Sequence, residues 1–348
     1  MVRSRWSATV GPRSAGAEPG PACYSKGGTA ATVTDAKLIT GVINPHNFLG
    51  GEIALDIDLA RQAYQPIAER LGVSIEEAAN GIIRLADHHM INALKLISVR
   101  RGYDPRDFVL IASGGGGPMH AAALARELLF KQVVIPPYPG HFSAWSMLMI
   151  KPRVDLLRTS VHNTRAVDAA TIQAVYAELQ AEALARFADA PVEQLIWQRS
   201  ADMRYYGQEH TVKVPLPAGA SCDIAEIERT FHAAHRRAYT FELPDAAIEF
   251  VTFHLTAWRN TRQPALRSLH GADQHGTPTV RGQRAVNFDV LGTHMVPIYE
   301  RDRLPAGFQA AGPLIIEEMA STTLVYPDQY LTVDSFANMI IRSQEASS

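Results

Sequence analysis

The sequence predicts an α/β protein made of two consecutive domains, of which the second is smaller and rich in β-strands. Helix and strand patterns alternate between residues 74 and 137, and four consecutive glycines stand where a strand pattern gives way to a helix pattern. Short apolar segments separated by turn residues fill the C-terminal part of the chain, as expected of a β-rich domain. We therefore expect one domain over residues 1–155 and another over residues 165–345.

Composition and charge exclude several classes of protein. The chain has 348 residues, of which 47% are hydrophobic, so it can bury a sizeable core. Its formal net charge of −2 provides no basic field for nucleic acid or an anionic membrane. Cys23 and Cys222 cannot form a disulfide framework, and no segment has the pattern of a signal peptide or the length of a membrane span. We expect a cytoplasmic protein without nucleic-acid or membrane partners.

Residues 1–30 are dominated by Gly, Pro, Ala and Ser and show no helical or alternating period. This composition predicts a loop, which is either a disordered tail or a stiff loop wrapped around a site. The Gly-Gly-Thr at residues 27–29 resembles a phosphate turn, but such a turn needs an acidic residue where Ser25 stands. Asp35, farther along, is either a polar residue of a site or an aspartate that caps a helix or a turn.

The clearest predicted helix covers residues 74–101. Ser74 and Glu77 form a capping box, and apolar residues then recur every three or four positions along one face. Gly102 and Pro105 end the pattern. A helix of this length is expected to cross a whole domain.

A second helix and two strands follow this helix. FVLIAS at residues 108–113 is typical of a short buried strand, and the four glycines come directly after it. PMHAAALARELLF at residues 118–130 predicts a helix, and KQVVIPP at residues 131–137 predicts the next strand. Because a helix connects them, the two strands are expected to be parallel.

Gly114–Gly117 predict that a ligand approaches the main chain closely. Glycines at a strand-to-helix turn expose the backbone, and the start of the helix offers free N–H groups, so a nucleotide is the usual occupant. The Gly-Lys-Ser/Thr of a P-loop is absent, and His120 replaces the last glycine of a G-x-G-x-x-G fingerprint. A turn that serves packing alone is the alternative, although four glycines exceed what a tight turn requires.

The C-terminal part combines helices with short β segments. The expected elements are helices over 166–189 and 224–240, two strands around a turn at Gly207, a strand over 248–258, a loop or insertion over 263–290, and four short β segments after residue 312. Glu317 and Glu318 end one of these segments. A metal-binding pair is one interpretation, but solvated charges are commoner at a strand end, and we predict no metal site.

Seven sequence runs, spread over nearly the whole chain, carry a resemblance to a known family. They are VGPRSAGAEPGPACYSKGG (10–28), TVTDA (32–36), FLGG (48–51), RGYDPRDFVLIASGGGGPMHA (101–121), VIPPYPGHFSAWSML (134–148), MRYYGQEHTVKVPLP (203–217) and GPLIIEEMASTTLVYPDQY (312–330). Jointly they resemble the hydantoinase A/5-oxoprolinase family. This family includes N-methylhydantoinases, 5-oxoprolinases and the ATP-dependent acetone and acetophenone carboxylases.

The resemblance implies a fold. It indicates an incomplete actin-like (sugar kinase/Hsp70-type) ATPase lobe followed by a smaller α+β, β-rich C-terminal domain. The family's Asp-x-Gly-Gly-Thr and Gly-Gly-Gly-Ser phosphate turns have no counterpart in this sequence. The chain is therefore similar to the C-terminal half of a full family member.

The resemblance also implies site residues. Ser113 and Gly114–Gly117 match the turn that packs against adenosine in such folds. His120, on the next helical turn, either contacts the nucleotide or caps the helix. Asp35 is the candidate catalytic residue. Three residues of the N-terminal loop are candidates to face the substrate, namely Ser14, Gly16 and Gly20.

The family's chemistry implies ATP and Mg²⁺ as cofactors, with phosphorylation of an amide, imide or enolate oxygen. The first hypothesis is a subunit or fragment of an ATP-dependent cyclic-amide hydrolase of the hydantoinase/5-oxoprolinase type. The alternatives are a subunit of an ATP-dependent ketone carboxylase of the acetone/acetophenone type and a non-catalytic truncated remnant. The expected partners are a small cyclic amide or ketone substrate, a hydantoinase B-type subunit and the missing N-terminal half.

Overall fold

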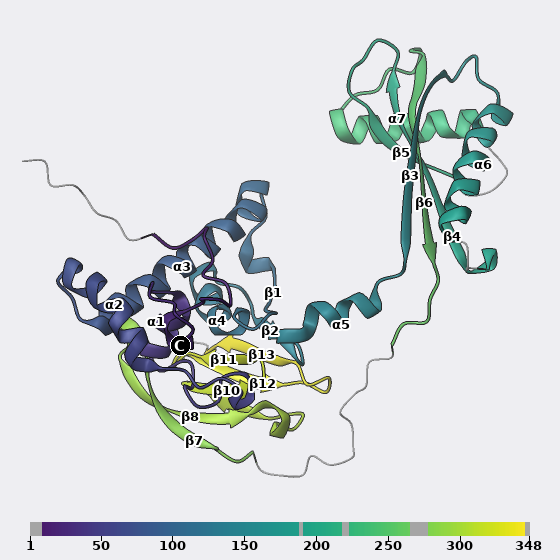
Figure 1. Cartoon of the computed structure of the whole chain (residues 1–348). Coiled ribbons are helices and arrows are strands. Elements are labelled where there is room, and N and C mark those ends of the chain that lie inside the picture. The colour runs from purple at the N-terminus through teal and green to yellow at the C-terminus, as the bar shows by residue number, and fades with distance from the viewer. Residues whose placement is uncertain (1–8, 188–190, 218–222, 265–277, 345–348) are drawn as a thin grey trace, which may run out of the picture. The chain divides into compact units, whose positions relative to one another are not determined.

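The computed structural model describes residues 9–187, 191–217, 223–264 and 278–344. Its described residues form a mixed α/β fold with three β-sheets. The chain divides into two compact units: unit 1 is Met1–Met147 with Ala265–Ser348, and unit 2 is Leu148–Pro264 (Figure 1). These units differ from the two consecutive domains expected from the sequence, because the last strands of the chain return to the sheets of unit 1.

Helices make up the N-terminal part of unit 1. They are α1 (Val33–Ile39), α2 (Ile57–Leu71) and α3 (Ile75–Ile97), and they share one apolar core with the N-terminal loop. The predicted capping box is confirmed, since the Ser74 hydroxyl accepts from the Glu77 N–H and the Glu77 carboxylate accepts from the Ser74 N–H.

A five-stranded sheet lies beside these helices. Its order is β1 (Leu110–Ile111), β2 (Val133–Ile135), β13 (Met339–Ser343), β12 (Gln329–Val333) and β9 (Gln309–Ala311). β1 and β2 are parallel, as predicted, and α4 (Gly117–Leu128) connects them. The remaining pairings are antiparallel, so the C-terminal strands extend the sheet that β1 and β2 begin. The helix α5 (Phe142–Met149) follows β2 and contains the boundary between the two units.

The second sheet of unit 1 comes entirely from the C-terminal part of the chain. Its order is β11 (Ser321–Val325), β10 (Leu314–Glu318), β8 (Thr293–Glu300) and β7 (Gly282–Asn287). The expected loop over residues 263–290 is wrong where β7 lies, because this segment pairs along its whole length with β8 and buries Val286 completely. Residues 265–277 of that loop lie outside the described residues.

Unit 2 is an antiparallel sheet that shares one apolar core with two helices. The sheet order is β3 (Arg153–Asn163), β6 (Ile248–Arg259), β4 (Leu195–Tyr205) and β5 (Val212–Leu216), and the helices are α6 (Ala169–Arg186) and α7 (Ile224–Tyr239). Both predicted helices and the turn at Gly207, where φ is 85°, are confirmed.

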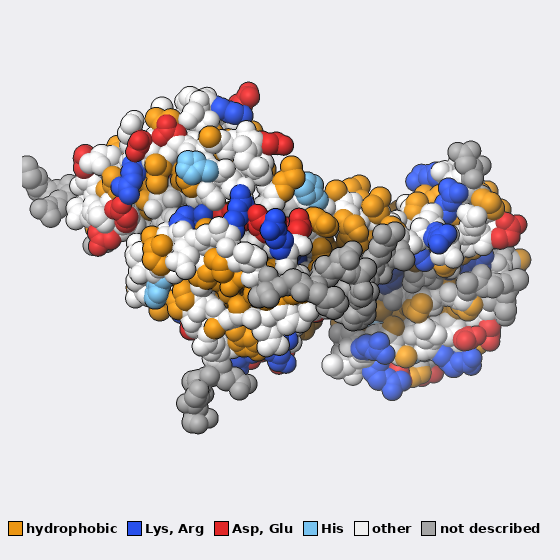
Figure 2. Space-filling view, turned by 90° about the horizontal axis from the view of Figure 1, so that it is seen from below, with side chains coloured by type: hydrophobic (Ala, Val, Ile, Leu, Met, Phe, Trp, Pro, Cys, Tyr) orange, Lys and Arg blue, Asp and Glu red, His pale blue; other side chains and the backbone are white. Residues whose placement is uncertain are grey.

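The surface carries charges of both signs. Acidic and basic side chains lie next to one another on the face of unit 1 seen in Figure 2, as the small net charge leads one to expect. Within the described ranges, no helix combines the length and the apolar character needed to span a membrane.

Candidate functional site

The glycines of the turn between β1 and α4 differ in how strongly the structure demands a glycine. Gly114 has a φ of 83°, which favours glycine, and its N–H donates to the Pro139 carbonyl oxygen at 2.7 Å. A Cβ on Gly115 would lie 3.0 Å from the Ala320 carbonyl oxygen, so the close approach of the β10–β11 turn leaves little room for a side chain there. Gly116 has a φ of −91°, and a Cβ there would meet nothing within 4 Å. Neither conformation nor packing therefore demands glycine at position 116.

A pocket of about 430 Å³, which we call the glycine pocket, opens beside this turn. It is lined by five segments: the N-terminal loop, the first turn of α1, the loop over residues 43–53, the glycine turn with the first turn of α4, and the β10–β11 hairpin. Tyr24 and Phe48 form an aromatic part of the wall, with ring centroids 5.6 Å apart, and Met119 adds an apolar part. Among the residues expected to bind nucleotide, two line the pocket and the others do not: Gly115 and Gly116 do, whereas Ser113, Gly114, Gly117 and His120 do not.

A larger pocket of about 910 Å³, which we call the loop pocket, is formed mainly by residues 9–34. The three residues expected to face a substrate all line it, namely Ser14, Gly16 and Gly20. Arg13 is the one charged side chain among the described residues of its lining. Tyr24 and Thr34 line both pockets, so the two adjoin. Residues 9–34 therefore form a wall of a cavity, and residues 1–8 lie outside the described residues.

Asp35 anchors this loop from inside the protein. It is completely buried at position N3 of α1, where its carboxylate and Thr32 form a capping box. The carboxylate accepts from the Thr32 hydroxyl at 2.7 Å, the Thr32 N–H at 2.9 Å and the Cys23 N–H at 2.8 Å. Asp35 lines neither pocket. The structure therefore gives Asp35 a capping position. This is the second of the two interpretations that the sequence offered, the first being a polar residue of a site.

We expect Asp35→Asn to lower the free energy of unfolding by about 2 kcal/mol, because an amide nitrogen would face buried N–H donors that the carboxylate now satisfies. The measurement is urea-induced unfolding of the 348-residue chain. Asp58→Asn, at an exposed position in the first turn of α2, is the matched control and should change stability by less than about 0.5 kcal/mol. Equal stability of Asp35→Asn and wild type would show that the carboxylate does not anchor the loop.

His120 belongs to a buried charged cluster behind the glycine turn. Its Nδ1 lies 2.5 Å from an Asp87 carboxylate oxygen on α3, and since a carboxylate only accepts, Nδ1 carries the proton. Lys37 is 2% exposed and donates to the Met119 carbonyl oxygen at 3.2 Å. Burial lowers the pKa of Lys37 to about 8, against the attraction of Asp87. Burial, assisted by the Lys37 cation, also lowers the pKa of His120. This cluster connects α1, α3 and α4.

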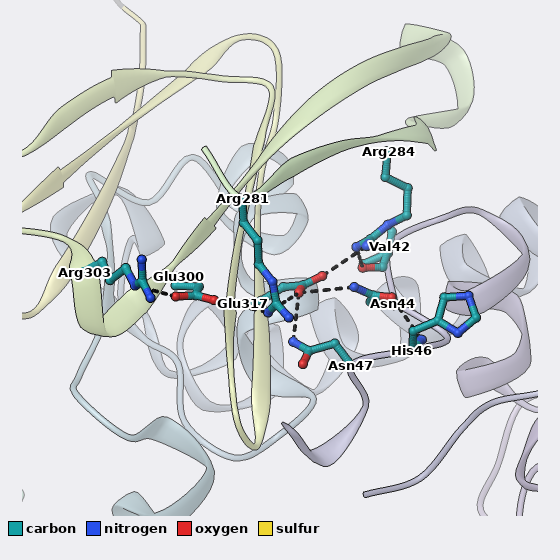
Figure 3. Close-up of polar contacts among 9 residues, drawn as sticks. All are labelled: Val42, Asn44, His46, Asn47, Arg281, Arg284, Glu300, Arg303 and Glu317. Carbon is teal, nitrogen blue, oxygen red and sulfur yellow. Dashed lines mark hydrogen bonds and ion pairs between the residues drawn. The ribbon is translucent and has the colours of Figure 1, made fainter. Parts of the chain in front are cut away.

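Glu317 is the centre of a second polar network, at the edge of the glycine pocket (Figure 3). Its carboxylate accepts from Arg284 at 3.0 Å, from the Asn47 amide at 2.9 Å and from the Asn44 amide at 3.3 Å. The Arg281 guanidinium lies 3.9 Å away. The Glu317 side chain is only 3% exposed. The network thereby ties the β10 end to the loop over residues 43–53, and both segments line the pocket.

Glu318, the neighbouring carboxylate, pairs with a different arginine. It lies 3.4 Å from Arg301, whose guanidinium also donates to the carbonyl oxygens of Ile135 and Ala337. Burial raises the pKa of Glu318 to about 7, although Arg301 opposes the shift. The expectation of solvated charges is wrong, because both side chains are buried against arginines. Arg284 lies on β7, which β8 separates from β10, and Arg301 directly follows β8. Nowhere in the described chain do three or more His, Cys, Asp or Glu side chains gather as a metal would require.

Sequence reasoning missed several residues of the two pockets. Phe48, Asn47, Met119 and Tyr24 line the glycine pocket, but no local pattern marks any of them as a ligand contact. These residues lie inside or beside the sequence runs that carry the family resemblance, and this position was the signal in the sequence that could have identified them. The capping box at Thr32 could have been recognised from its Thr-x-x-Asp spacing.

Comparison with known proteins identifies relatives over nearly the whole chain. The family model for hydantoinase/oxoprolinase matches residues 2–155, and the model for the hydantoinase/oxoprolinase C-terminal domain matches residues 159–343. Caprolactamase subunit alpha from Pseudomonas jessenii is 33% identical to the chain, over 94% of the chain and 48% of the relative.

Two solved structures are also similar. The nucleotide-free structure of acetone carboxylase has a TM-score of 0.82 at 25% identity, covering 93% of this chain and 48% of that one. The crystal structure of the ATP-dependent caprolactamase from Pseudomonas jessenii has a TM-score of 0.73 at 32% identity, covering 95% and 49%. The chain thus spans about half the length of the relatives it matches. The matches cover both compact units, and the chain belongs to the hydantoinase/oxoprolinase family.

Proposed function

We propose that the glycine pocket holds the adenosine part of ATP. The observation that carries the proposal is Gly116, which lines the pocket although neither its backbone conformation nor its neighbours exclude a side chain. The absence of a side chain leaves room for a flat ligand against the main chain. Tyr24, Phe48 and Met119 provide apolar contact, and Asn44 and Asn47 provide polar groups for the edge of a base.

We propose that the full protein is an ATP-dependent hydrolase of cyclic amides. This proposal is supported by the similarity to caprolactamase, which is described as ATP-dependent. ATP would phosphorylate the amide oxygen, which makes the amide carbon electrophilic enough for water to attack. The C–N bond would then break, with the nitrogen leaving as the protonated amine and the phosphoryl group leaving as phosphate. In this chain, the glycine pocket would orient the nucleotide, and the loop pocket that shares Tyr24 and Thr34 with it would receive the amide. Asp35 would position the loop without touching substrate.

The residues of the glycine pocket do not fit a Mg²⁺ site of their own. Glu317 and Glu318 are the carboxylates in the described lining, and Arg284 and Arg301 already neutralise them. No step of the proposed reaction is therefore assigned to a metal bound by these residues.

We propose that the chain works together with a partner subunit in the cytoplasm, where ATP is supplied. The relative from Pseudomonas jessenii is itself described as a subunit. β1 stands at the edge of its sheet, and Val109, which directly precedes it, and Ile111, on it, are 43% and 63% exposed. Such an apolar sheet edge is a suitable surface for association.

A ketone carboxylase subunit is the second candidate. The acetone carboxylase structure supports it, because its TM-score of 0.82 exceeds the 0.73 of caprolactamase, although its identity is lower. The two reactions differ in the role of the activated substrate. In the hydrolase the phosphorylated amide is the electrophile that water attacks, whereas in the carboxylase the phosphorylated enol supplies the nucleophilic carbon that attacks a bicarbonate-derived electrophile. The test uses the chain assembled with its partners. The carboxylase is favoured if this assembly consumes ATP with a ketone, in a bicarbonate-dependent way, and consumes none with a lactam.

The test of the glycine pocket is Gly116→Val. We expect the 348-residue chain to bind ADP and the variant to lose binding at least tenfold, because a branched side chain would fill space that the fold leaves open. Thermal unfolding should change little, since nothing lies within 4 Å of the added Cβ. The measurements are isothermal titration calorimetry with ADP and thermal unfolding of the same samples.

Gly282→Val is the matched control for this experiment. Gly282 is also open to a Cβ, but it begins β7 and lines neither pocket. ADP affinity should be unchanged in this variant. Wild-type affinity in a folded Gly116→Val variant would remove the glycine turn from the nucleotide site.

A further inference from the structure

We propose that the loop pocket binds an oxyanion, namely a carboxylate or phosphate group carried by the molecule that reacts beside the nucleotide. This inference rests on the proposed function for its setting, because it names the chemistry of the second ligand. It goes beyond that function in assigning an anionic group to a cavity of about 910 Å³.

The charge of the lining favours an anion. Arg13 is the one charged side chain that the described lining contains, and no carboxylate faces the cavity from it. Glu18 is the acidic residue of the described N-terminal loop, but it is not among the residues that line the pocket. Asp35 is completely buried and already accepts hydrogen bonds from Cys23 and Thr32. An anion in the pocket would therefore meet a cation without an opposing carboxylate on the wall.

The main chain of the pocket offers unused donors. In the described structure, the N–H groups of residues 26–31 donate to no protein acceptor, whereas the flanking N–H groups of Ser25 and Thr32 do. Residues 27–31 all line the loop pocket. Gly27 has a φ of 89°, a left-handed conformation of the kind found where successive N–H groups form anion-binding concavities. These groups are available to an oxyanion once water is displaced.

The donor segment is held in place at both ends. The Asp35 carboxylate accepts from Cys23 before the segment and from Thr32 after it. In its middle, a Cβ on Gly28 would lie 2.1 Å from the Gly20 carbonyl oxygen, so two stretches of main chain are packed directly together. A loop fixed in this way loses little conformational freedom when it binds a ligand.

The loop pocket is also positioned for a reaction with the nucleotide. Tyr24 and Thr34 line both pockets, and the Thr34 hydroxyl makes no hydrogen bond with the described residues. An oxyanion in the loop pocket would thus lie next to the glycine pocket. The same chemistry can come from two sources: the phosphoryl group in transit, or a carboxylate of the substrate.

The test is a titration of the 348-residue chain with inorganic phosphate and, separately, with succinate, by calorimetry at constant ionic strength. We expect at least one of the anions to bind and Arg13→Gln to weaken that binding about tenfold, the effect of one charge-assisted hydrogen bond. Arg13→Lys should weaken it less, since the charge is kept. Arg100→Gln, an exposed arginine outside both pockets, should leave the affinity unchanged. Binding of phosphate alone identifies the phosphoryl source, and binding of succinate alone identifies the carboxylate source.

Two further measurements separate this inference from the proposed function. Adenosine, which has no phosphate, reports on the glycine pocket alone, so Arg13→Gln should bind it as wild type does. Gly116→Val should bind the anion normally. Adenosine binding without binding of either anion would overturn the oxyanion site and leave the nucleotide proposal standing. Equal anion affinity in Arg13→Gln and wild type, or anion binding that is lost in Gly116→Val, would also overturn it.

Discussion

Replacing Glu317 with alanine is expected to lower the free energy of unfolding of unit 1 by about 3–5 kcal/mol, as the loss of one partner of a buried ion pair does. The Glu317 side chain is 3% exposed and the Arg284 side chain 17% exposed, so the variant would leave a guanidinium charge in a largely dry place. The amides of Asn44 and Asn47 would lose their acceptor as well. Calorimetric thermal unfolding, which separates the transitions of the two units if they unfold independently, is the appropriate measurement.

Glu300→Ala provides the comparison for this prediction. Glu300 belongs to the same group of charges in Figure 3, but its side chain is 31% exposed and its partner Arg303 is 70% exposed. A solvated pair contributes little, so we expect a loss below about 1 kcal/mol. The double variant Arg284→Met with Glu317→Leu should recover part of the loss, because no unpaired charge remains. Similar losses for Glu317→Ala and Glu300→Ala would contradict the structural account of the network.

Lys37→Met is expected to remove a pH-dependent contribution of about 3 kcal/mol to the free energy of unfolding. Burial lowers the pKa of Lys37 from 10.5 to about 8, and one pKa unit corresponds to about 1.4 kcal/mol. Between these two values the unfolded chain binds more protons than the folded chain, so the stability of the wild type rises with pH there. Below pH 8 both states are protonated, and the full destabilisation by the buried cation is present.

The measurable quantity is the difference in unfolding free energy between wild type and Lys37→Met, followed from pH 8 to 10.5. It should shift by about 3 kcal/mol in favour of wild type as the pH rises. The hydrogen bond from Lys37 to the Met119 carbonyl oxygen is lost in the variant at every pH, and the change in its strength when Lys37 titrates is already contained in the pKa shift. Lys95→Met, an exposed lysine on α3, should show no such shift. A flat difference for Lys37→Met would mean that water reaches the lysine in the folded state.

Elements that depend on neighbouring residues were predictable. The capping box of Ser74 and Glu77 requires only the spacing of two side chains, and the structure has it. The parallel pair of β1 and β2 follows from the order of the apolar segments, because the segment between the two strands has the pattern of a helix, which became α4. The family resemblance was likewise carried by short runs of residues, and it is confirmed.

Within the glycine turn, prediction reached its limit. The sequence identified Gly114–Gly117 as exposed main chain but treated the four residues alike. Only the fold separates them, because Ala320, from the hairpin between β10 and β11, is the group that approaches Gly115 and leaves Gly116 open. Whether position 116 needs a glycine is therefore decided by a segment about two hundred positions farther along the chain.

The sequence by itself determined local structure and family, and it predicted Ser14, Gly16 and Gly20 of the N-terminal loop as candidates for a site. Tertiary structure alone decided that Glu317 and Glu318 are buried beside arginines, that Lys37 is a buried cation near Asp87, and that β12 and β13 extend the sheet of β1 and β2. The physical reason is the range of the interactions. Caps, turns and periodicity act within a few residues and leave a local pattern, whereas desolvation and strand pairing depend on which distant segments meet, and no local pattern specifies that.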